Sequence, residues 1–494
     1  MSEKYEVVVG LEIHAQCNTK SKMFCGCDND SFGKEPNINT CPICMGFPGM
    51  LPVVNAQAVQ KGIKAGLALG CKIPRLSQFD RKNYFYPDLP KAYQITQFDE
   101  PVAVDGEVEI ELQPDTDEHG NPSGDPIYRK IGLERLHLEE DAGKLTHTAT
   151  GTLCDYNRSS TPLMEIVSKP DMRSIEEASA YAREVQRIVR YVGASDADME
   201  KGMMRFDINV SLRPFGQEEL GTKVEVKNVN SFRSLERALA YEIKRQSELL
   251  DDGKASDIVQ ETRGWDDERG TTESQRTKEG ASDYRYFPEP DLPPLIAEES
   301  MVRALKAELP ELPVAKKKRF MSEYDLNFEY AGILTNDSEI ADFFEEAVKV
   351  AGGGSDVASK VANMITNVIS AFMETDRISI SDAKLSAADL GEIVKMMING
   401  EISSTATKEV IEEIFKNGGT PNQVVESKGL KQVSDTGLID ELCKKVIEAN
   451  PSVVEEIKSG KPQAIGFLVG QVMKDSKGQA NPAMVSQTLI GMIG

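Results

Sequence analysis

The chain has 494 residues, which predicts two to four domains and a large buried interior. Its formal net charge of −23 at pH 7 argues against a protein that binds nucleic acid over its whole surface, although it leaves room for a local basic patch. With 40% hydrophobic and 28% charged residues, no apolar run of the roughly 18 residues that a membrane span needs, and no signal pattern at its start, the sequence predicts a cytoplasmic globular protein.

The first strand-like run, VVVGLEIHAQC over residues 7–17, places polar side chains inside an apolar segment. In extended backbone successive side chains point to opposite faces, so Glu12, His14 and Gln16 share one face of this strand. The sequence therefore predicts a strand with one buried apolar face and one face that carries an acid beside a histidine.

Four of the eight cysteines follow in a tight group, as a C-x-C pair and a C-x-x-C pair. They are Cys25, Cys27, Cys41 and Cys44. Four thiolates at this spacing predict a closed tetrahedral zinc site, which would shape the loop and leave no open position for a substrate. Loose free thiols or a redox pair are the alternatives.

Acidic side chains recur inside later strand-like runs. They are Glu139, Glu140, Asp141, Glu165, Asp207 and Glu225. Burying an ionised carboxylate is costly without a compensating cation, and several carboxylates converging with a histidine would suit Mg²⁺. Alternatively, each acid faces solvent or pairs with a nearby arginine, for which the candidates are Arg129, Arg135, Arg158 and Arg205. On pattern alone, His137 and His147 are expected to be structural.

The first half also contains two predicted helices. One spans 174–192, where Ser174 and Glu177 fit a capping box and Gly193 fits a helix end, and a second spans about 231–250. Strands and helices mixed in this way predict an α+β domain with antiparallel strands. Prolines within 286–296 predict the end of this domain near residue 295.

Beyond that point the strand signal fades and helical periodicity dominates. The predicted helices span 338–350, 356–374, 387–398, 408–415 and 438–449. We expect a helical domain over 296–410 and a small all-α tail over 411–494. The chain has no phosphate-binding P-loop, no dinucleotide-binding glycine motif and no nucleophile elbow, so any ATP would be held through metal and individual basic side chains.

Several long motifs resemble one known family. VVVGLEIHAQC, FDRKNYFYPDLPKAYQI, NRSSTPLMEIVS, DYRYFPEPDLPPL and GFLVGQVMKDSKGQANP are similar to the GatB family, the B subunits of tRNA-dependent amidotransferases, and the likeness runs from residue 5 to about 485. The resemblance implies a cradle domain over 1–295 that is similar to the catalytic fold of glutamine synthetase and guanidino kinases. It also implies a helical domain and a tail similar to the YqeY family.

The resemblance further implies an activity. Members use ATP to activate the side-chain carboxylate of Glu-tRNA(Gln) or Asp-tRNA(Asn) as an acyl phosphate, which ammonia then converts to the amide. The implied partners are a glutaminase subunit that supplies ammonia, a third subunit that clasps the complex, and the misacylated tRNA. The implied cofactors are ATP and Mg²⁺, beside the structural Zn²⁺ that the cysteine spacing predicts.

Site residues carried over from the family fall into sets. The group assigned to catalysis and magnesium consists of Glu12, His14, Glu140 and Glu165. A neighbouring magnesium group contains Asp207 and Glu225. Glu139 is added to the magnesium set, although regular alternation puts it opposite Glu140. The remaining assignments are ATP phosphate for Arg158 and Arg205, the ammonia channel for Lys82 and Lys91, and tRNA for Lys474 and Lys477.

Two other classes of function remain open at this point. A zinc-dependent nucleic-acid-binding module would bind RNA without using ATP, which the acidic net charge disfavours. A free-standing ligase that joins ammonia to a small carboxylic acid would need no tRNA, which the long helical half disfavours.

Overall fold

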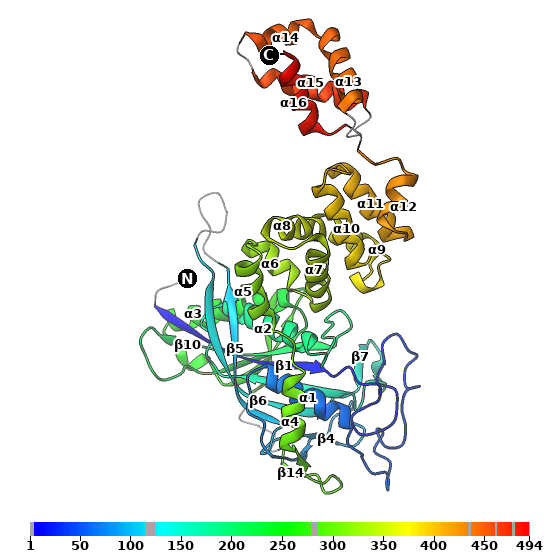
Figure 1. Ribbon diagram of the computed structural model, residues 1–494. Helices are drawn as coiled ribbons and strands as arrows, with labels where there is room; N and C mark the ends of the chain where they lie inside the picture. Colours follow the sequence, from blue (N-terminus) through cyan, green and yellow to red (C-terminus); the bar gives the residue numbers. More distant parts are fainter. Residues whose placement is uncertain are drawn as a thin grey trace. The chain divides into compact units, whose positions relative to one another are not determined.

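A computed structural model describes residues 4–113, 124–277, 284–432, 436–459, 462–476 and 480–493. The chain forms two compact units, which divide between Val314 and Ala315 (Figure 1). No helix in these ranges is both long enough and apolar enough to cross a bilayer.

The first unit is built on an eight-stranded sheet with the order β13-β12-β11-β10-β1-β9-β6-β5. All neighbouring strands in it are antiparallel except β11 and β12, which run parallel. The strands are β1 Tyr5–Gln16, β5 Ala103–Leu112, β6 Ile127–Glu140, β9 Pro162–Ser168, β10 Met204–Pro214, β11 Val224–Val229, β12 Glu261–Asp266 and β13 Thr271–Thr277. The prediction of an α+β domain rich in antiparallel strands is confirmed.

Three helices cover the apolar face of this sheet: α1 Ala56–Ala68, α2 Ile175–Tyr191 and α3 Phe232–Asp251. Leu11 and Ile13 of β1 join this core, so alternation along β1 directs Glu12 and His14 to the other face, as expected. The backbone of the sheet thus separates a packed core from the surface that carries the polar side chains.

The two predicted helices of this unit are present, with one correction. Ser174 caps α2 by accepting a hydrogen bond from the Glu177 N–H, as the capping box requires. The Glu177 carboxylate, however, accepts from the Arg173 N–H at 2.7 Å and not from Ser174. The predicted box is therefore closed on one side only, because the chain before the helix brings the Arg173 N–H within reach.

Short strands of the first unit form three small sheets besides the large one. They are β2 Leu76–Ser77, β3 Asp80–Asn83, β4 Tyr93–Thr96, β7 Lys144–Thr148, β8 Gly151–Asp155, β14 Phe287–Pro288 and β15 Leu295–Ile296, with the 3₁₀ turn Ala255–Asp257. β14 pairs with β3 and β15 pairs with β2, and helix α4 Glu299–Ala307 packs against α1. The proline-rich segment 286–296 thus folds back onto the first unit.

The second unit is helical. Its helices are α5 Pro313–Glu323, α6 Phe328–Leu334, α7 Ser338–Ala351, α8 Ser355–Met364, α9 Ser370–Asp376, α10 Ala387–Ile398, α11 Ser404–Asn417, α12 Pro421–Ser427, α13 Thr436–Ala449, α14 Pro451–Lys458, α15 Ile465–Asp475 and α16 Pro482–Ile493, with 3₁₀ turns at Ile380–Asp382 and Pro462–Ala464. A π-helical turn, Ile365–Ile369, joins α8 to α9 where one helix was expected.

Two separate hydrophobic clusters stabilise this unit. The first runs from Phe320 to Val425, and the second from Ile439 to Ile493. The first cluster includes Ile411 and Val425, which lie beyond the boundary expected at residue 410. The three-domain division stays a prediction.

Candidate active site

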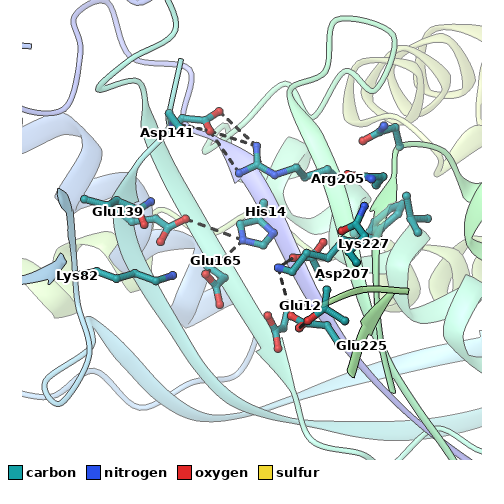
Figure 2. Close-up of a pocket in the computed structure, with 18 of the residues that line it drawn as sticks. Glu12, His14, Lys82, Glu139, Asp141, Glu165, Arg205, Asp207, Glu225 and Lys227 are labelled. Carbon is teal, nitrogen blue, oxygen red and sulfur yellow. Dashed lines mark hydrogen bonds and ion pairs between the residues drawn. The ribbon is translucent and has the colours of Figure 1, made fainter. Parts of the chain in front are cut away.

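The polar face of the large sheet holds a pocket of about 720 Å³ (Figure 2). Side chains from β1, β6, β9, β10 and β11 line it. Six of the seven residues predicted to bind magnesium are among them: Glu12, His14, Glu139, Glu165, Asp207 and Glu225. Acids that are distant in the chain therefore converge, which chain order alone did not establish.

One group in the pocket consists of His14, Glu139 and Glu165. His14 is directly opposite Glu165 in the pairing of β1 with β9. The His14 Nε2 lies 3.3 Å from Glu165 Oε2 and 4.0 Å from Glu139 Oε1. One ligand atom from each of the three residues lies within 4.8 Å of the others, so this group could hold a metal ion.

A second group consists of Glu12, Asp207 and Glu225. Glu12 is paired with Asp207 across β1 and β10, and β11, which carries Glu225, pairs with β10 on its other side. Their ligand atoms also lie within 4.8 Å of one another. The Asn209 side-chain amide donates to Glu12 Oε1 at 2.9 Å and orients that carboxylate.

The charges in the pocket shift the pKa of several groups. Burial raises the pKa of Glu165, but His137 and His14 outweigh burial and hold it well below its usual value. Burial and the neighbouring Glu165 charge instead raise the pKa of Glu12. Burial lowers the pKa of His137, yet Glu165 and Glu139 raise it to about 9. The proton that His137 holds therefore compensates part of the negative charge of Glu165 and Glu139.

The chemistry of these side chains fits a divalent cation. Each group offers two or three carboxylates, which are the hard oxygen donors that Mg²⁺ prefers, and the first adds an imidazole nitrogen. The other ring nitrogen, His14 Nδ1, is buried without a hydrogen-bond partner among the residues described. The Nε2 of His14 faces the Glu139 and Glu165 carboxylates of the pocket, where a metal ion would be bound.

Arg205 and Arg158 have different surroundings. Arg205 lines the pocket and forms an ion pair with the buried Asp141 at 3.3 Å. Arg158 lies 3.4 Å from the same Asp141 and donates to the backbone carbonyls of Ala142 and Gly143. Of the two arginines assigned to phosphate, Arg205 is the one that lines the pocket.

Glu140 is the predicted magnesium residue that the structure does not bring to this pocket. Its backbone position alternates with Glu139, and its carboxylate accepts from the Ile95 N–H at 3.0 Å and from Lys91 Nζ at 2.5 Å. The expectation that Glu140 lies beside His14 and Glu165 is therefore corrected: Glu139 occupies that place, because strand alternation continues to the end of β6.

The two lysines assigned to an ammonia channel lie in different cavities. Lys82 reaches into the large pocket, with its Nζ 5.0 Å from the centre of the Tyr284 ring. Burial lowers its pKa, but the acidic groups of the nearby Tyr286 and Glu139 raise it overall. Lys91 lines a separate cavity of about 220 Å³ beside the cysteine loop.

The four cysteines converge as their spacing predicts. One Sγ atom from each lies within 4.8 Å of the others, so the cluster could bind a metal such as zinc. A hydrogen bond from Cys25 lowers the pKa of the Cys44 thiol to about 5, and Lys22 assists at 4.0 Å from the Cys44 sulfur. A thiolate is the form that binds metal.

Two residues in or beside the pocket were missed or undervalued from the sequence. His137, expected to be structural, pairs with Glu165 across β6 and β9, and its Nε2 lies 3.3 Å from Glu165 Oε2. Lys227 forms ion pairs with Asp207 and Glu225. The sequence held one signal for both. His137 is two residues from Glu139 and Lys227 is two residues from Glu225, and this spacing places side chains on the same face of a strand.

The residues assigned to tRNA belong to the second unit. Lys474 is exposed near the end of α15. Lys477 lies outside the residues that the structure describes.

An acid-lined pocket with perturbed pKa values on a mixed sheet is typical of an enzyme. Residues 7–303 match the family model of the GatB/GatE catalytic domain, and residues 342–493 match that of the GatB domain. The chain belongs to the GatB family, whose members are parts of a multisubunit enzyme.

Curated relatives agree over nearly the full length. The chain is 48% identical over 491 residues to the B subunit of aspartyl/glutamyl-tRNA(Asn/Gln) amidotransferase from Crocosphaera subtropica, covering 98% of this chain and 97% of the relative. It is 47% identical over 488 residues to the protein of the same name from Brevibacillus brevis, covering 98% of each chain.

Proposed function

We propose that this chain is the component that activates and amidates the side-chain carboxylate of Glu-tRNA(Gln), Asp-tRNA(Asn) or both. Two clusters of possible metal ligands converge in one pocket, and the cationic side chains of Lys82, Arg205 and Lys227 also line it. This convergence supports the proposal most directly. The curated relatives are named for an aspartyl/glutamyl-tRNA(Asn/Gln) amidotransferase, and that name supplies the substrates.

The proposed chemistry has two steps. A carboxylate is a poor electrophile, so an oxygen of the tRNA-borne carboxylate attacks the γ-phosphorus of ATP, and ADP leaves. Ammonia then attacks the acyl carbon, inorganic phosphate leaves with the carbon–oxygen bond pair, and the ammonium proton passes to solvent or a pocket carboxylate. Both reacting groups of the first step are anions, which must be brought together against their repulsion.

The pocket side chains have complementary roles in this step. His14, Glu139 and Glu165 would hold one Mg²⁺, and Glu12, Asp207 and Glu225 would hold a second. The bound ions would supply charge neutralisation between phosphate and carboxylate. Arg205 and Lys82 face the same space and would bind phosphate oxygens, while the ion pair with Asp141 fixes the orientation of Arg205.

Further assignments follow from the family and complete the proposal. The glutaminase partner would release ammonia from glutamine, Lys82 and Lys91 would border its route, and the clasp partner would hold the complex together. The exposed Lys474, together with Lys477, would contact tRNA in the cytoplasm. The same proposal places domain boundaries near residues 295 and 410. It also includes a first domain similar to the catalytic fold of glutamine synthetase.

The cysteine cluster is proposed to bind structural zinc. We expect the purified chain to contain about one zinc ion, and Cys44→Ser to lose it, since four thiolates form a closed site. Elemental analysis by mass spectrometry measures this. Cys154→Ser, which removes a cysteine outside the cluster, should keep the zinc. A zinc-free wild type, or Cys44→Ser with full zinc, would contradict the assignment.

The function is tested by reconstitution. The chain is co-expressed with its glutaminase and clasp partners and supplied with ATP, glutamine and each misacylated tRNA. We expect an ATP-dependent amide on at least one tRNA, and none on free glutamate or aspartate. A folded complex that forms no amide on either tRNA would refute the proposal, while amide formation on the free amino acids would favour the small-molecule ligase.

A further inference from the structure

Lys227 lies between the acids of the second group. Its Nζ is 2.8 Å from Asp207 Oδ2 and 3.2 Å from Glu225 Oε1. Figure 2 shows Lys227 beside these two acids. The geometry follows from the strand, because Glu225 and Lys227 are two residues apart on β11 and share a face. The ammonium therefore already compensates the carboxylates that would bind the second metal ion.

An ammonium and a divalent ion compete for this position. Both would use the oxygens of Asp207 and Glu225, and two cations within one small set of carboxylates repel each other. A divalent ion bound to these oxygens would therefore repel the Lys227 ammonium and favour its departure.

The structure also offers Lys227 a place to go. Its side chain is 41% exposed and lines the large pocket, where Arg205 and Lys82 also point. A lysine has a flexible four-carbon stem, so its ammonium can turn from one anion to another without movement of the strand. In the proposed reaction, the anion that enters this pocket is the triphosphate of ATP.

We propose that Lys227 is an exchanging cation. It occupies the Glu12, Asp207 and Glu225 group before metal binds, and it moves to the ATP phosphates when a divalent ion replaces it. This inference rests on the proposed function of the pocket. It adds that Lys227 weakens metal binding in the absence of nucleotide and strengthens nucleotide binding. Substituting Lys227 should therefore change the metal affinity and the nucleotide affinity in opposite directions.

The test measures both affinities on the full-length chain carrying Lys227→Gln. Mn²⁺ binding without nucleotide is followed by electron paramagnetic resonance, and binding of a non-hydrolysable ATP analogue by calorimetry. We expect Mn²⁺ to bind the Glu12, Asp207 and Glu225 group about tenfold more tightly in the variant than in the wild type. We expect the ATP analogue to bind about tenfold more weakly. Lys223→Gln removes the same charge from an exposed position outside the pocket and should change neither.

Two further variants keep the test decisive. Lys227→Met preserves the apolar stem and should reproduce both changes if the glutamine variant folds poorly, whereas Lys227→Arg retains a cation and should bind the analogue as the wild type does. Unchanged Mn²⁺ affinity, or two affinities that fall together, in a folded Lys227 variant would overturn the exchange. Absence of Mn²⁺ binding from wild type and variants alike would instead overturn the metal pocket of the proposed function.

Discussion

Replacing Glu165 with glutamine is expected to reduce tRNA-dependent amide formation by about 10³-fold. Glu165 is central to the first group, because His14 and His137 each place Nε2 at 3.3 Å from its Oε2. Glutamine keeps the shape of the side chain but removes the negative charge that would bind Mg²⁺. We therefore expect Glu165→Gln to lose amide formation while the chain stays folded.

The measurement is single-turnover amidation by the complex with the glutaminase and clasp partners. Trp265, the only tryptophan, lies in β12 of the same sheet, so its fluorescence reports on the folding of this unit. Glu134→Gln, on an exposed part of β6, is a matched control and should keep full activity. A folded Glu165→Gln complex with near-normal turnover would contradict the role of Glu165.

Replacing Glu140 with alanine is expected to lower the stability of the first unit by about 3 kcal/mol while leaving Mn²⁺ affinity unchanged. Glu140 is 2% exposed, and removing its carboxylate leaves the buried ammonium of Lys91 without this partner and the Ile95 N–H without its acceptor. Breaking one side of a buried ion pair costs more than the pair contributes, because the remaining charge stays desolvated.

Urea unfolding followed by Trp265 fluorescence measures this change. Glu139→Gln provides the comparison, since Glu139 lies in the pocket one residue earlier and should lose metal affinity with a smaller loss of stability. The opposite pattern, with Mn²⁺ affinity lost in the Glu140 variant and kept in the Glu139 variant, would show that the two acids have been assigned the wrong way round.

The sequence predicted the polar face of β1 correctly because strand alternation is a local property. Glu12 and His14 point to the pocket, and Ile13 packs in the core, as period-two patterning requires. The same rule could not choose between Glu139 and Glu140, because the pattern does not tell which of two adjacent acids faces the pocket. That choice depends on the pairing of β6 with β9, which aligns His137 with Glu165.

Other features depended on contacts that no local pattern contains. Lys227 forms its ion pairs with acids on two strands, one of them twenty residues away in the chain. Arg205 was expected to meet phosphate, but its partner Asp141 could be identified only once β10 and β6 were placed in one sheet. The longer helices of the second unit, such as α7, α10 and α13, were predicted more easily, because amphipathic periodicity and turn residues mark them locally. The shorter α5, α6 and α12 were not predicted.

The location of bound metal tests the central claim most directly. Crystals of the chain soaked with Mn²⁺ would be examined by anomalous diffraction at the manganese edge. The account predicts one ion among His14, Glu139 and Glu165 and a second among Glu12, Asp207 and Glu225. An ion bound at Glu140, or a pocket that stays free of Mn²⁺ at saturating concentration with ATP present, would contradict it.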